Sequence, residues 1–125
     1  MSADDEGVGT FDEPALEALV ELTGSPRAMG DLVRAFSASA AQLRAAIAGG
    51  DQTGDAKAAQ RAAHSLKSSS AMFGARDLAE ICEKLEDHAA TAPTSPPLFR
   101  QADVAALDAA LARALACLAR RFPAV

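Results

Sequence analysis

One histidine has the residue type and the neighbours to carry chemistry. His64 lies in the middle of a helix expected over about residues 55–73, and Lys67 follows three residues later. On a helical wheel His64 falls about 160° from Leu66, the centre of the expected core face, so it points to solvent. Residues three apart are neighbours on a helix, and a nearby ammonium disfavours a protonated imidazole. Neutral imidazole is a nucleophile, and a phosphoryl group on it would have Lys67 as counter-charge.

Other interpretations of the polar residues are weaker. On spacing alone, His64 could be one more solvated histidine. His88 lies near the end of a later helix, where it suits the helix dipole. A di-iron site needs Glu-x-x-His on two helices, but Arg61 and Leu85 occupy the required positions. The serines beside His64, including Ser69 and Ser70, are expected to bond to the preceding turn of their own helix.

Apolar residues recurring every three or four positions predict five helices. Asp12 and Ser25-Pro26 are start signals for the first two, and glycines are expected to end several of them. The expected spans are Asp12 to Gly24, Ser25 to Gly49-Gly50, Asp55 to Phe73, Arg76 to Ala90, and a last helix that follows Ser95-Pro96-Pro97 and closes at Pro123. The predicted fold is an all-α, up-down-up-down antiparallel four-helix bundle with a short additional N-terminal helix as a lid.

The same spacing predicts which residues face the core. The second helix is expected to bury a face that includes Leu32, Val33 and Phe36. Around Leu66, the third helix is expected to bury Ala59, Ala62, Ala63, Ser69, Ser70 and Phe73.

Composition supports this fold class. Half of the 125 residues are hydrophobic and thirty-two are alanine, whereas valine and isoleucine together number seven and tryptophan and tyrosine are absent. Alanine and leucine favour helices, and a β-sandwich would need more β-branched and aromatic residues. One domain over residues 12–125 is expected, preceded by a flexible acidic tail over residues 1–11.

Charge and sequence composition exclude several classes of protein. The net charge of −5 equals the charge of residues 1–13, and the remainder is neutral, so no basic face for nucleic acid is expected. No uncharged stretch is long enough to span a membrane, and the start lacks the features of a secretory signal. Cys82 and Cys117 fall on apolar helical faces, as buried reduced thiols of a cytoplasmic protein would.

A longer string of residues resembles a known family. The sequence HSLKSSSAMFGA at 64–75, followed by Leu78, Cys82 and Leu85-Glu86, is similar to the signature of histidine phosphotransfer (HPt) domains of bacterial phosphorelays. The family pattern is roughly H-x-L-K-G-S-S, then a hydrophobic residue, Gly and Ala, with L-x3-C-x2-L-E on the next helix. The resemblance covers about residues 12–90, and the family's last helix fits residues 96–122.

The resemblance implies a role for each matching residue. His64 would accept a phosphoryl group from an aspartyl phosphate on a receiver domain and return it to another receiver. Lys67 matches the lysine that steadies the phosphate, and Glu86 matches a Gln or Glu that bonds to and orients the imidazole. Ser68 departs from the family glycine, which gives the receiver room to approach. The expected docking surface is Gln60, Arg61, Ser68 and Ala71.

The implied protein is a phosphocarrier rather than an enzyme. Its expected partners are response-regulator receiver domains and a hybrid sensor histidine kinase, with no nucleic acid or membrane contact, and it is expected to be a monomer. It would bind no cofactor or metal itself, and Mg²⁺ would belong to the receiver. The alternative is a non-phosphorylated HPt-like adaptor that only docks. Such an adaptor need keep neither His64 nor Lys67, and this chain has both.

Overall fold

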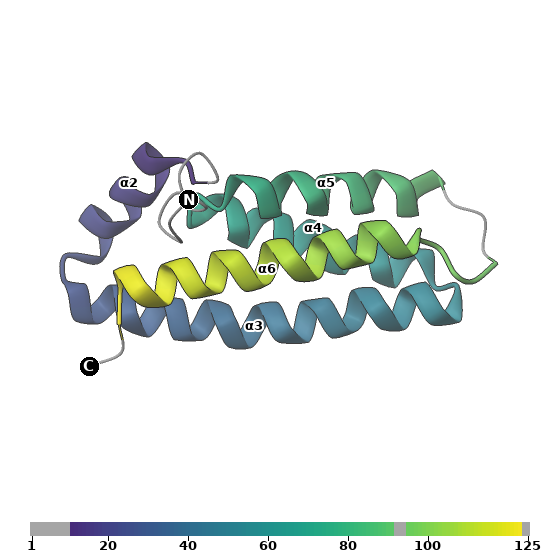
Figure 1. Ribbon diagram of the computed structural model, residues 1–125, viewed down its shortest axis with the longest axis horizontal. Helices are drawn as coiled ribbons and strands as arrows, with labels where there is room; N and C mark the ends of the chain where they lie inside the picture. Colours follow the sequence, from purple (N-terminus) through teal and green to yellow (C-terminus); the bar gives the residue numbers. More distant parts are fainter. Residues whose placement is uncertain (1–10, 92–94, 124–125) are drawn as a thin grey trace.

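The fold is all-α, which confirms the predicted class. The computed structural model describes residues 11–91 and 95–123, so the predicted acidic tail lies, apart from Phe11, outside the described residues. Four helices lie along the longest axis and alternate in direction, and α2 crosses one end of them (Figure 1). The helices are α2 (Glu13–Thr23), α3 (Pro26–Thr53), α4 (Ala56–Met72), α5 (Arg76–Thr91) and α6 (Gln101–Arg121). None of these helices has both the length and the apolarity needed to cross a bilayer.

Three helices begin with a side chain that caps the free N–H groups of the first turn. Asp12, Ser25 and Asp55 each accept a hydrogen bond from the backbone N–H group three residues along, at 3.1–3.2 Å. Pro14 and Pro26 lie in the first turns of α2 and α3, where a missing N–H group breaks no helical hydrogen bond. The predicted starts of these three helices are therefore confirmed.

The end of α3 differs from the prediction. Gly49-Gly50 does not stop this helix, which continues to Thr53 and ends at Gly54, whose φ of 81° is a left-handed value suited to glycine. At Gly50, a Cβ atom would lie 2.8 Å from the Cβ of Ala59 on α4. The absence of a side chain lets α3 and α4 approach closely, and this packing outweighs the poor helix propensity of glycine.

The last helix also begins later than predicted. It starts at Gln101 rather than directly after Ser95-Pro96-Pro97. Leu98 and Phe99, which lie between, are buried without being helical. The Asp51 carboxylate accepts a hydrogen bond from the Phe99 N–H group at 2.8 Å, across 48 residues of sequence. The Leu98 N–H group also donates to the Asp51 carbonyl at 3.3 Å, and the two bonds hold this non-helical segment against the end of α3.

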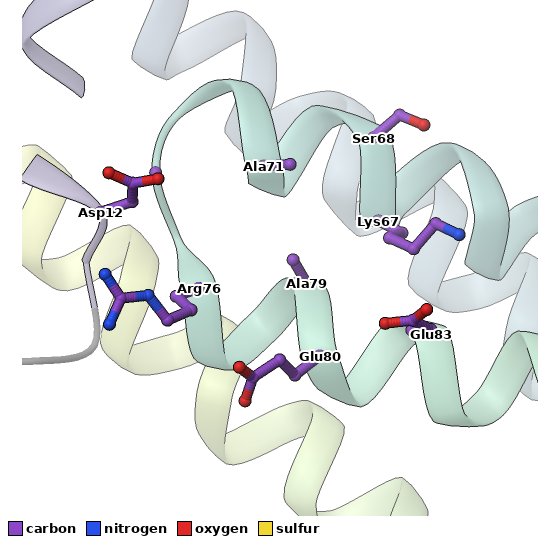
Figure 2. A pocket seen from close by; sticks show the side chains of 9 residues that line it. Asp12, Lys67, Ser68, Ala71, Arg76, Ala79, Glu80 and Glu83 are labelled. Atoms are coloured by element: carbon purple, nitrogen blue, oxygen red, sulfur yellow. The ribbon is translucent and has the colours of Figure 1, made fainter. Parts of the chain in front are cut away.

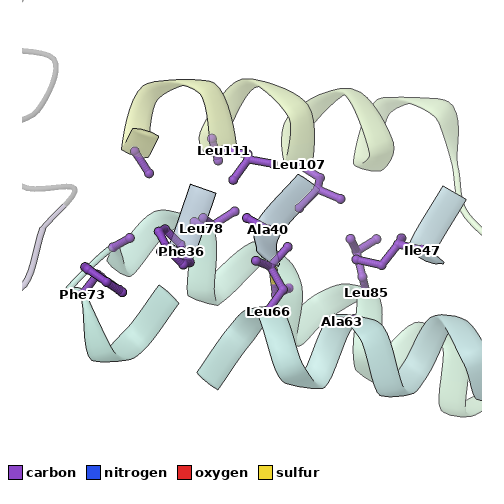
Figure 3. Close-up of a cluster of buried hydrophobic side chains, with 14 of the residues drawn as sticks. Phe36, Ala40, Ile47, Ala63, Leu66, Phe73, Leu78, Leu85, Leu107 and Leu111 are labelled. Carbon is purple, nitrogen blue, oxygen red and sulfur yellow. The ribbon is translucent and has the colours of Figure 1, made fainter. Parts of the chain in front are cut away.

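The core lies between the long helices, and side chains from all of them contribute to it. Leu66 of α4, Leu85 of α5 and Leu107 of α6 point into the same interior (Figure 3). Phe36 of α3 stacks on Phe73, just beyond the end of α4, with ring centroids 4.6 Å apart. The predicted alanines of α4 (Ala59, Ala62 and Ala63) are all buried, so this helix packs with small side chains against its neighbours.

Two residues assigned to the core face lie elsewhere. Leu32 is 38% exposed, because Val33 and Phe36 occupy the buried stripe of α3 and Leu32 lies beyond its edge. Ser69 is half-buried rather than buried, whereas Ser70 is fully buried. Both hydroxyls donate to the carbonyl four residues earlier, as predicted, so neither needs a partner in the core.

Candidate functional site

His64 lies on the exposed surface of α4, as the helical wheel predicts. Its side chain is 58% exposed, while Leu66, two residues along, is fully buried. Two of the residues next to it on this surface are short: Ser65 and Ser68 are exposed, and the Ser68 hydroxyl donates to the His64 carbonyl at 3.2 Å. The imidazole can therefore be approached from solvent by a large molecule.

Glu86 joins His64 to Lys67. On the neighbouring helix α5, its Oε2 lies 2.7 Å from His64 Nδ1 and its Oε1 lies 2.7 Å from Lys67 Nζ. The Glu86 side chain is only 16% exposed, so the carboxylate is held in place between the helices. The structure thus brings together the three residues that the sequence analysis singles out, across 22 residues of sequence.

The charges of Glu86 and Lys67 are fixed by their contacts. The Lys67 ammonium, and to a lesser degree the His64 ring, hold the pKa of the Glu86 carboxyl below its usual value although burial opposes this. Glu86 in turn raises the pKa of Lys67, with smaller contributions from Glu83 and Asp87. Glu86 is therefore an ionised acceptor near neutral pH, and Lys67 is charged.

This charge state assigns the imidazole tautomer. An ionised carboxylate only accepts hydrogen bonds, so a neutral His64 donates its Nδ1 hydrogen to Glu86. The lone pair is then on Nε2, the ring nitrogen not engaged by Glu86. An exposed imidazole oriented in this way can act as a nucleophile toward a group delivered from outside.

The four predicted docking residues all lie on α4. Arg61, Ser68 and Ala71 are exposed on the same side as His64, and Gln60 is half-buried at its edge. Three large apolar side chains also lie on the surface: the spacing assigns Leu32 to the core, and it gives no sign that Leu22 and Met72 are exposed. These side chains are Leu22 of α2 at 82% exposure, Leu32 in the first half of α3 at 38% and Met72 at the end of α4 at 56%. Their exposure could not be predicted from the sequence, because spacing alone does not show where the buried face of a helix ends.

The turn after α4 fixes the end of the site. Gly74 has a φ of 72°, and a Cβ atom there would lie 2.5 Å from the Asp12 carbonyl oxygen. The Asp12 N–H group donates to the Gly74 carbonyl at 2.6 Å, and Phe11 forms a bridge to Ala75. The turn at Gly74-Ala75 thus anchors the start of α2 against the junction of α4 and α5.

The remaining reactive side chains lie apart from the trio. Cys82 is buried, and burial raises the pKa of its thiol to about 12, while Cys117 is half-buried; both are free. His88 is exposed on α5 with its ring 5.9 Å from that of Phe99. Within residues 11–91 and 95–123, no three His, Cys, Asp or Glu side chains gather as a metal site would require.

A helical bundle that presents one carboxylate-supported histidine is typical of phosphotransfer domains. A family model described as the Hpt domain matches residues 28–117 of this chain. Because this match covers well over half of the sequence, the chain belongs to the Hpt domain family.

A solved structure supports the same fold. The chain is similar to the crystal structure of histidine-containing phosphotransfer protein B from Pseudomonas aeruginosa PAO1, with a TM-score of 0.78. The two are 22% identical, and the match covers 91% of this chain and 95% of the other. At this identity the likeness establishes the fold. No curated protein matches the sequence.

Proposed function

We propose that this protein carries phosphoryl groups in a phosphorelay. His64 would accept the group from an aspartyl phosphate on one receiver domain and pass it to the aspartate of another. The observation that carries the proposal is the exposed imidazole with Nδ1 bonded to Glu86, which leaves Nε2 free in a domain of the Hpt family. A hybrid sensor histidine kinase in the cytoplasm would be the source of the phosphoryl group.

The geometry supports a simple transfer step. The Nε2 lone pair would form a bond to phosphorus while the bond from phosphorus to the aspartyl oxygen breaks, and the aspartate would leave as a carboxylate. Positive charge develops on the ring, and the Glu86 carboxylate at Nδ1 would stabilise it. The reverse step would deliver the group to the second receiver. Mg²⁺ would be bound by the receiver rather than by this chain.

Lys67 is close enough to contribute to the charge balance of this step. Its ammonium bonds to Glu86 Oε1, and the side chain is 29% exposed, so the ammonium borders the solvent beside His64. A phosphoryl group on Nε2 would offer it a second anionic partner. Phosphoryl transfer depends mainly on positioning and charge neutralisation, which Glu86 and Lys67 would provide together.

We place receiver docking on the exposed side of α4. Arg61, Ser68 and Ala71, with Gln60 at the edge, would surround the imidazole. The three exposed apolar side chains of α2, α3 and α4 (Leu22, Leu32 and Met72) would extend this surface, because protein interfaces combine an apolar centre with a polar rim. Ser68 in the family's glycine position adds only a short side chain, already bonded to the His64 carbonyl.

The test is transfer of labelled phosphate from a phosphorylated receiver domain. We expect label on this protein that is lost in acid and stable in alkali, as expected for phosphohistidine, and that is absent in His64→Gln. The matched control is His88→Gln, which removes the other histidine, exposed on α5 and outside the trio, and should leave labelling unchanged. Label retained in His64→Gln would overturn the site. Receiver binding without any label would favour the docking-only adaptor.

A further inference from the structure

A cavity of about 410 Å³ opens between α4 and α5, one helical turn from His64. Ala71, Gly74 and Ala79 line it, and the methyl groups of the two alanines face the gap from opposite helices (Figure 2). Lys67 and Ser68 line the end nearest His64. We call this space the α4–α5 cavity. It is large enough for a side chain from a partner, and its volume falls within the range of about 300–1,000 Å³ for ligand clefts.

Charged residues surround the small ones. Glu80 and Glu83, one turn apart on α5, are both exposed, and neither has an ion-pair partner within 4 Å among the described side chains. Lys67 is already bonded to Glu86. The other two charged residues, Asp12 and Arg76, lie at the opposite end, where the Arg76 guanidinium points toward Asp12 and away from Glu83 (Figure 2). The α5 wall therefore presents two carboxylates without an ion-pair partner within 4 Å among the described side chains, Glu83 nearer Lys67 and Glu80 nearer Arg76 (Figure 2).

This combination selects one kind of side chain. Lysine and arginine have a long aliphatic stem that packs on apolar surface and a cationic head that stays at the rim. In the α4–α5 cavity, the stem would lie against Ala71 and Ala79, and the head would reach Glu80 and Glu83. An acidic side chain would meet repulsion from both carboxylates, and an aromatic one would leave them unpaired.

We propose that the α4–α5 cavity receives a lysine or arginine side chain of the receiver domain that exchanges phosphate with His64. This inference rests on the proposed function. It follows from continuity, because Lys67 and Ser68 belong both to the surroundings of His64 and to the cavity wall, so a protein seated on the imidazole also covers the cavity mouth. The contact would help to determine which receivers dock productively.

The first test removes the two charges. The probe is a receiver domain that phosphorylates His64 in the labelling assay, and the readout is the receiver concentration that gives half-maximal transfer rate. Glu80→Gln with Glu83→Gln should raise this concentration on the order of fivefold at low salt, and less at high salt because exposed charges are screened. The control is Asp103→Asn with Asp108→Asn, two acidic residues of α6 outside the cavity and the proposed docking surface with the same change in charge, which should have little effect.

The second test fills the space without changing charge. Ala79→Leu should also raise the half-maximal concentration, whereas Ala90→Leu, an exposed position on the same helix outside the cavity, should not. Labelling of His64 by phosphoramidate, which needs no receiver, should be equal in all variants and shows that the site itself is intact.

The outcomes separate the two proposals. If the unaltered protein accepts phosphate but the cavity variants match their controls, the cavity inference is wrong and the proposed function stands. If charge and filling variants both weaken transfer relative to their controls, the inference is supported. If no receiver transfers phosphate to the unaltered protein, both proposals fail.

Discussion

At the scale of single residues, one carboxylate determines how the histidine is presented. Glu86 contacts both His64 and Lys67 at 2.7 Å, so the ring orientation and the ammonium position depend on the same side chain. Substitutions of Glu86 can therefore separate the effect of ring orientation on transfer from the effect of charge. A glutamine in the same place keeps an acceptor oxygen for Nδ1 but loses the ion pair with Lys67.

We therefore expect an order of transfer rates among substitutions of Glu86. Glu86→Ala leaves Nδ1 without its partner, and loss of such a supporting contact typically costs about 10- to 100-fold. Glu86→Gln should transfer phosphate at a rate between those of the alanine variant and the unaltered protein, because its amide oxygen can still accept the Nδ1 hydrogen but the negative charge beside the ring is lost. Transfer of labelled phosphate to each variant measures the order, with Asp87→Ala as the control on the same helix. Equal rates for the alanine and glutamine variants would show that orientation is unimportant.

Lys67 gives a separate prediction. Lys67→Ala should slow transfer to His64 while the bundle stays folded, because the lysine lies at the surface and its only described ion pair is with Glu86. The measurements are the rate of labelling and the helical circular dichroism signal. Lys84→Ala, an exposed lysine on α5 outside the trio, is the control. An unfolded Lys67→Ala protein would assign the lysine a structural role instead.

Part of the site is readable from the sequence alone. Spacing within one helix predicts that His64 is exposed and that Lys67 is near it, and the resemblance adds Glu86. The bond between Lys67 and Glu86 is not predictable in this way, because the residues are 19 apart on different helices and meet only after α4 and α5 pack. The α4–α5 cavity likewise depends on tertiary packing, since none of its small residues is unusual in its own helix.

At the scale of helices, the same distinction explains the errors. Capping residues act within a few positions, so the starts at Asp12, Ser25 and Asp55 are predicted correctly. The end of α3 and the start of α6 depend on distant partners, Ala59 for Gly50 and Asp51 for Phe99. Local propensity predicts that α3 ends at Gly49-Gly50 and that α6 begins directly after Pro97. Tertiary contacts move both boundaries.

The two adjacent glycines of α3 provide a matched test of this explanation. Gly50→Ala should destabilise the protein by about 1–3 kcal/mol, because its Cβ would lie 2.8 Å from both the Ala59 Cβ and the Asp55 carbonyl oxygen. At Gly49, an added Cβ atom would have no neighbouring atom within 4 Å. Gly49→Ala should therefore be neutral or stabilise the protein by roughly 0.5–1 kcal/mol, as expected for an exposed helical position. Urea unfolding followed by circular dichroism compares the two. Equal effects would mean that α3 and α4 do not approach closely at Gly50.

At the scale of the whole molecule, ion pairs connect helices that are distant in sequence. Arg44 of α3 pairs with Asp108 of α6 at 2.8 Å, and Arg121 at the end of α6 pairs with Glu13 at the start of α2 at 2.7 Å. With the Lys67–Glu86 pair between α4 and α5, these contacts join every described helix to another one. All three depend on an ionised carboxylate, so acid should weaken them together.

Stability should therefore fall in acid. The arginine or lysine partner lowers the pKa of Glu13, Glu86 and Asp108, in each case chiefly through its hydrogen bond. A carboxyl whose pKa is lower in the folded state stabilises the protein fully above its ordinary value, which is 4.5 for glutamate and 3.8 for aspartate. That contribution is lost as the pH falls through the folded-state values.

The free energy of unfolding in urea should thus be nearly constant from pH 7 to about 5 and decrease below about 4.5. Glu86→Gln should flatten part of this decrease, because one of the three titrating groups is removed. A free energy of unfolding that stays constant down to pH 3 would show that these ion pairs do not stabilise the bundle.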